Sequence, residues 1–83
     1  MFWISFADPG KPAGTQLLGV AIVPCDDLHE ALLWARDHGC NPGGEVLGTK
    51  LAWPVAARIK DSDIGRLLTL RQAEAVAAGL ARR

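Results

Sequence analysis

The chain has 83 residues, 49% of them hydrophobic, and its nine basic and nine acidic side chains give a formal net charge of zero. A chain of this length holds one modest core, so residues 1–83 are expected to form a single domain. The composition excludes a disordered protein, and zero net charge argues against a broad basic footprint for nucleic acid.

The sequence contains no membrane-spanning segment, since no apolar run approaches the roughly 18 to 20 residues that such a helix needs. The chain begins Met1, Phe2, Trp3, Ile4, without the basic region that precedes the apolar stretch of a secretory signal. Both observations predict a cytoplasmic protein with no membrane partner.

The first two predicted elements are strands joined as a hairpin. Alternation over residues 2–7 places Phe2, Ile4 and Phe6 on one face. Residues 8–15 contain two prolines and two glycines, a strong turn signal. The second strand, over residues 17–23, is apolar on both faces, so we expect it inside the sheet or covered on its second face by a partner.

An amphipathic helix follows, opened by Asp26 and Asp27 and closed at Gly39. Asp27 and Glu30 have the spacing of a capping box, and glycine is the usual residue at the left-handed position that ends a helix. Its core stripe is predicted to be Leu28, Ala31, Leu32 and Ala35. The turn over residues 41–44 then leads into a third strand over residues 45–51.

The second half is less regular. The pattern assigns no element to residues 52–65, where residues 55–59 fit a short helix or an edge strand. Thr69 and Gln72 repeat the capping-box spacing and open a terminal helix. One face of that helix is predicted to carry Leu70, Ala73, Ala77 and Leu80, and Arg82 and Arg83 suit its negative end.

These elements predict an α+β fold: a small, mostly antiparallel three-stranded sheet of β-β-α-β order with a C-terminal helix. The strand order 2-1-3 is favoured over the alternative, in which the third strand lies parallel to the second. We expect the helices to cover one face and to leave Trp3 and alternate residues of the second strand on the other, as a docking face.

The cysteines and histidines suggest two kinds of chemistry, of which the first is zinc binding. Cys25, His29, His38 and Cys40 are the residue types of a tetrahedral zinc site. About 14 helical residues separate the two cysteines by roughly 20 Å, too far for one ion or for a disulfide. We therefore expect no metal, no cofactor and unpaired cysteines, as in a reducing compartment.

The second kind of chemistry is nucleophilic catalysis. Cys25 before a helix with His29 one turn further has the outline of an activated thiolate, which makes a small enzyme or ligand-binding protein an alternative. Asp26, Asp27 and Glu30 oppose it, because nearby negative charge raises the pKa of a thiol. A buried structural role for Cys25 is favoured, and no catalytic residue is predicted.

The charge is unevenly distributed along the chain. Residues 1–49 carry two basic and six acidic side chains, a net charge of −4, and residues 50–83 carry seven basic and three acidic, a net charge of +4. Such a bipolar chain favours attraction between its halves or to a partner. Nucleic-acid binding through the basic half is a further alternative, but the spacing matches no recognition module.

Tryptophan and arginine are enriched in binding hot spots, although core packing is the commoner role of Trp34 and Trp53. The candidate residues of a protein interface are Trp3, Trp34, Trp53, Arg66 and Arg71.

Three segments, Phe2–Pro9, Leu18–Val23 and Asn41–Val46, resemble a family of short uncharacterised proteins of bacteria and their mobile elements. The resemblance implies a compact cytoplasmic protein without a cofactor and carries over no activity or site residue. By analogy of size and type, such proteins bind and block a host machine, as anti-CRISPR inhibitors do. We therefore expect a non-enzymatic protein–protein interaction module, acting on a protein partner or as a homodimer. In its specialised form it is a phage or mobile-element inhibitor of a host defence complex.

Overall fold

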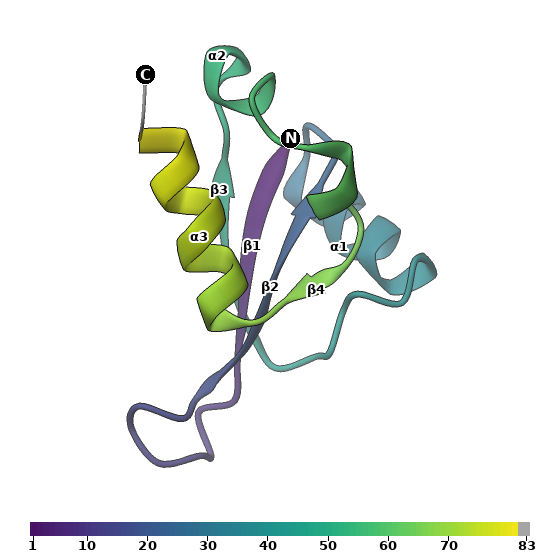
Figure 1. Ribbon diagram of the computed structural model, residues 1–83. Coiled ribbons are helices and arrows are strands. Elements are labelled where there is room, and N and C mark those ends of the chain that lie inside the picture. The colour runs from purple at the N-terminus through teal and green to yellow at the C-terminus, as the bar shows by residue number, and fades with distance from the viewer. Residues whose placement is uncertain (82–83) are drawn as a thin grey trace.

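The computed structural model describes residues 1–81 and contains a four-stranded sheet with helices on both faces (Figure 1). Arg82 and Arg83, expected at the end of the last helix, lie outside the described residues. The elements are β1 (Phe2–Ala7), β2 (Leu17–Val23), α1 (Leu28–Asp37), β3 (Glu45–Lys50), α2 (Trp53–Ala56), the 3-10 helix η1 (Asp61–Asp63), β4 (Leu67–Leu68) and α3 (Leu70–Ala81).

The strand order is β3-β1-β2-β4, and all three strand pairs are antiparallel. The predicted order 2-1-3 is therefore confirmed, with β1 between its two partners. The prediction of three strands is wrong by one, because β4 pairs with β2 at Val20–Leu68 and Ala21–Leu67. A two-residue strand carries no alternation that a sequence pattern can reveal.

The first core layer lies between the sheet and α1. Phe2, Ile4 and Phe6 of β1 are buried there with two residues each of β2 and α1, namely Ala21, Val23, Ala31 and Ala35. The predicted core stripe of the helix is confirmed, since Leu28 and Leu32 also pack against this cluster.

The predicted ends of α1 are also confirmed. The carboxylate of Asp27 accepts a hydrogen bond from the backbone N–H of Glu30 at 3.0 Å, which satisfies one unpaired donor of the first turn. Gly39 has a φ of +74° just beyond the last turn, and the N–H of Cys40 donates to the carbonyl of Ala35 at 2.9 Å.

The second core layer lies on the opposite face of the sheet, under α3. Its buried members are Val20, Ile22, Ile59, Leu68 and Ala73. The expectation that the helices cover one face is wrong: because both faces of β2 are apolar, burial of both needs a helix on each side. Trp3 is half-buried against this second layer and does not lie on an open face.

The terminal helix begins with the predicted capping box. The N–H of Gln72 donates to Oγ1 of Thr69 at 3.2 Å, and the N–H of Thr69 donates to Oε1 of Gln72 at 2.9 Å. The predicted apolar face is partly wrong, because Val76 packs against the second layer with Ala73 and Leu80, whereas Leu70 is 55% exposed.

Residues 52–65, to which the sequence pattern assigned no element, contain α2 and η1. Arg58, which lies between them, bonds the C-terminal end of α3. The guanidinium of Arg58 donates to the carbonyl of Leu80 at 2.7 Å and to the carbonyl of Gly79 at 2.9 Å. A cation suits this end of a helix, where the last carbonyls lack N–H partners.

The turn into β3 requires glycine. Gly43 and Gly44 have φ values of +85° and +86°, and a Cβ on Gly44 would collide with the backbone carbonyl of Ala7, whereas nothing lies near a Cβ on Gly43. Gly43→Ala should therefore lower the free energy of unfolding by about 1 kcal/mol, the cost of a left-handed backbone alone.

In Gly44→Ala the new Cβ also collides with the backbone carbonyl of Ala7, so this variant should lower the free energy of unfolding by about 3 kcal/mol. Urea denaturation of both variants measures the two losses. Equal losses in the two variants would contradict this close approach of Gly44 to β1.

Candidate functional site

The most exposed part of the sheet is its β3 edge. β3 pairs with β1 over six residues, from Phe2–Lys50 to Ala7–Glu45, and within residues 1–81 no strand lies on its other side. All but one of its residues are exposed, the half-buried Gly48 being the exception. An open edge presents unpaired N–H and C=O groups to which another strand can bond.

This edge lacks most of the features that protect natural edge strands. Proline, bulges, short length and central charges prevent edge-to-edge pairing in other proteins. Between Glu45 and Lys50 the strand reads Val46, Leu47, Gly48, Thr49, without charge or proline, and its register with β1 is uninterrupted. By contrast, β4 at the opposite edge has only two residues.

Leu47 marks the part of the second sheet face that α3 leaves uncovered. Register places Val20, Ser5 and Leu47 in one row across β2, β1 and β3. Val20 is buried under α3, Ser5 is half-buried and Leu47 is 71% exposed. The docking face predicted at Trp3 and the second strand is therefore covered, and the exposed apolar side chain on this face of the sheet is Leu47 of β3.

Trp53 is the most exposed large apolar side chain in the described chain, at 79%. It begins α2, three residues beyond the end of β3, and is followed directly by Pro54. An exposed tryptophan is typical of interfaces, where its large ring gains most from being covered.

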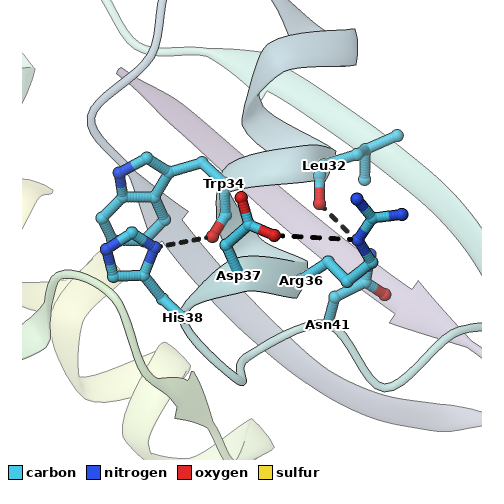
Figure 2. A network of polar contacts seen from close by, with 6 residues as sticks. All are labelled: Leu32, Trp34, Arg36, Asp37, His38 and Asn41. Carbon is cyan, nitrogen blue, oxygen red and sulfur yellow. Dashed lines mark hydrogen bonds and ion pairs between the residues drawn. The ribbon is translucent and has the colours of Figure 1, made fainter.

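Trp34 has a packing role. Its ring stacks on the imidazole of His38 (Figure 2), with centroids 3.6 Å apart and 12° between the planes. A Cβ on Gly65 would lie 2.8 Å from the indole. Gly65 also has a φ of +78°. The half-buried indole therefore packs α1 against the loop before β4.

The C-terminal end of α1 is fixed by polar contacts around this stack (Figure 2). Nδ1 of His38 lies 2.8 Å from the carbonyl of Trp34, and Nδ2 of Asn41 donates to the carbonyl of Leu32 at 3.4 Å. Arg36 and Asp37 form a solvent-exposed ion pair at 3.8 Å. The contacts of His38 and Asn41 bond two carbonyls of α1 and so stabilise this end of the helix.

The five predicted interface residues do not form one patch. Trp3 lies against the second core layer and Trp34 lies on the opposite side of the sheet, whereas Trp53 is on α2. Arg66 pairs with Asp63 at 3.6 Å, and Arg71 is exposed in the first turn of α3. Leu47, the most exposed large apolar residue of the edge strand, was missed because alternation alone does not show which strand ends a sheet.

The surroundings of Cys25 oppose an activated thiolate. Partial burial raises the pKa of the Cys25 thiol, and Glu30, Asp26 and Asp27 raise it further, against a lowering by the chain's N-terminal amine. Burial also raises the pKa of the Cys40 thiol. A raised pKa leaves less thiolate at neutral pH, and the thiolate is the nucleophile.

The two cysteines are free thiols, and residues 1–81 contain no cluster of three or more potential metal ligands. None of the helices in this part of the chain is long and apolar enough to cross a membrane. Comparison with protein-family models, curated proteins and solved structures gives no match.

Cys25 should react with a thiol reagent more slowly than free cysteine at neutral pH, because its raised pKa suppresses the thiolate. Rates of disulfide exchange with an aromatic disulfide, measured across a pH series, should rise only above the range in which free cysteine ionises. The Cys25→Ser variant, which keeps only Cys40, shows how much of the measured reaction belongs to Cys25. A Cys25 that outpaces free cysteine at neutral pH would support the enzyme alternative.

Proposed function

We propose that this chain is a non-enzymatic protein-interaction module that pairs with a second copy of itself through the open edge of β3. The observation that supports this proposal most strongly is a six-residue edge strand with an uncharged centre and a leucine that is 71% exposed. Pairing of two such edges would satisfy their outward backbone groups and continue the sheet across both copies.

Symmetry restricts the register of such a pair. A two-fold axis perpendicular to the sheet keeps each residue on the same face in both copies, so one residue must face its own equivalent. Centring the pair on Leu47 places the two exposed leucines opposite each other, Val46 opposite Gly48, and Glu45 opposite Thr49. No like charges then face each other.

The charges at the strand ends are compatible with this arrangement. β3 begins with Glu45 and ends with Lys50. Because side chains alternate along a strand, Glu45 and Lys50 point to opposite faces of the sheet and do not meet across the paired edges. The backbone hydrogen bonds and the leucines therefore supply most of the affinity.

Leu47→Glu should weaken the dimer by about tenfold or more, because it removes the leucine contact and places two carboxylates opposite each other. Leu47→Lys should do the same with two ammonium groups. An equimolar mixture of the two variants should restore the dimer as a heterodimer, since opposite charges then face each other.

Sedimentation equilibrium of each variant and of the mixture measures these masses. Leu70→Glu and Leu70→Lys are the matched controls, since Leu70 is exposed on α3 and should leave the dimer unchanged. A wild-type chain that stays monomeric at all concentrations, or a mixture no tighter than its components, would contradict pairing centred on Leu47.

We also propose a more specific role for the chain, as an inhibitor of a bacterial defence complex such as a CRISPR effector. In this role a second surface, separate from the β3 edge, binds the complex. An inhibitor needs a binding surface and no active site, and Trp53 supplies an exposed anchor that β3 pairing does not use. The chain should then reduce DNA cleavage by a susceptible effector in vitro.

Trp53→Ala should lower this inhibition by about tenfold, whereas Leu33→Ala, an exposed leucine on α1, should leave it intact. Unchanged cleavage by every effector type, or equal losses in both variants, would contradict this role.

A further inference from the structure

A groove of about 380 Å³ lies between α3 and the segment that joins α2 to β4. Its rim is basic and its floor is aliphatic. The groove is lined, among others, by Arg58, Lys60 and Arg66 and by Ile59, Val76 and Leu80. Its volume lies within the range of about 300–1,000 Å³ that is typical of sites for small molecules.

The mouth of the groove offers basic donors. Asp63 is the only carboxylate among the described residues that line it, and it pairs with Nη2 of Arg66 at 3.6 Å. The guanidinium of Arg58 is engaged with the carbonyls of Gly79 and Leu80 at the negative end of α3. The donors that face a ligand are therefore the ammonium of Lys60, which is exposed to solvent, and the remaining N–H groups of Arg66.

The floor is a poor match for nucleotide bases and for bare inorganic anions. Ile59 is buried, and Val76 and Leu80 are half-buried, so the bottom of the groove offers aliphatic surface. No aromatic ring lies among the described residues that line it, so this part of the chain offers no stacking platform of the kind on which nucleic-acid bases bind. A bare inorganic anion would leave this apolar surface uncovered.

We propose that the groove binds a small amphipathic carboxylate, with its aliphatic tail on Ile59, Val76 and Leu80 and its carboxylate held by Lys60 and Arg66. Arginine and lysine form the stronger, charge-assisted class of hydrogen bond with carboxylates. Burial of the tail raises the affinity by about fourfold for each methylene removed from water. This site goes beyond the pairing of β3 and does not depend on it.

Titration of the ¹⁵N-labelled chain with octanoate, followed by amide chemical shifts, tests the proposal. Saturable shifts should centre on residues 58–66 and 75–80. Octanol, which has the tail without the charge, and inorganic phosphate, which has charge without the tail, should each bind about tenfold more weakly.

Lys60→Gln and Arg66→Gln should each weaken octanoate binding by about fivefold, since each removes one charged donor. Arg71→Gln is the matched control, because Arg71 lies on α3 but outside the groove, and it should bind as the wild type does. Equal binding of octanol and octanoate, an equal loss in Arg71→Gln, or shifts confined to another surface would overturn the proposal.

Discussion

The fold depends on one constraint, namely that β2 is apolar on both faces and must be covered on both. Ala21 and Val23 face α1, and Val20 and Ile22 face α3, and all four are buried. Neither helix alone could bury both sets, because successive side chains of a strand point to opposite faces. The short β4 beside β2 leads directly into α3 and so places this helix on the face that α1 leaves open. The two core layers lie on the two faces of β2 for this reason, and the groove lies along the helix that covers the second face.

The same constraint explains why the opposite edge is open. A chain of this length buries only about 60–65% of the surface that its unfolded form exposes. The helical cover is centred on β2, and β3 at the far side of β1 receives little of it, so its residues stay exposed apart from the half-buried Gly48. Large apolar side chains therefore stay exposed where the cover ends, namely Leu47 at the β3 edge and Trp53 beyond it. The proposed interaction module would use the β3 edge, which the small core leaves exposed.

Local signals in the sequence predicted the local structure well. Asp27, Gly39 and the Thr69–Gln72 capping box act through bonds within a few residues, so the sequence reveals them directly. The side of the sheet that α3 covers and the existence of β4 depend on contacts between distant residues, which periodicity does not record. Trp3 and Trp53 show the difference: one is half-buried in a central strand and the other exposed beyond the last paired residue of β3. Likewise, the basic residues between positions 58 and 66 meet the apolar side chains of α3 in one groove only in the folded chain.

Amide hydrogen exchange, measured residue by residue over a range of protein concentrations, tests the pairing of β3 most directly. An edge N–H that points to solvent exchanges freely, and it becomes protected only when another strand accepts its hydrogen bond. If two copies pair as proposed, the outward N–H groups between Val46 and Lys50 will exchange more slowly as concentration rises, while those of α1 stay constant. Exchange rates in β3 that do not change with concentration would contradict pairing through this edge.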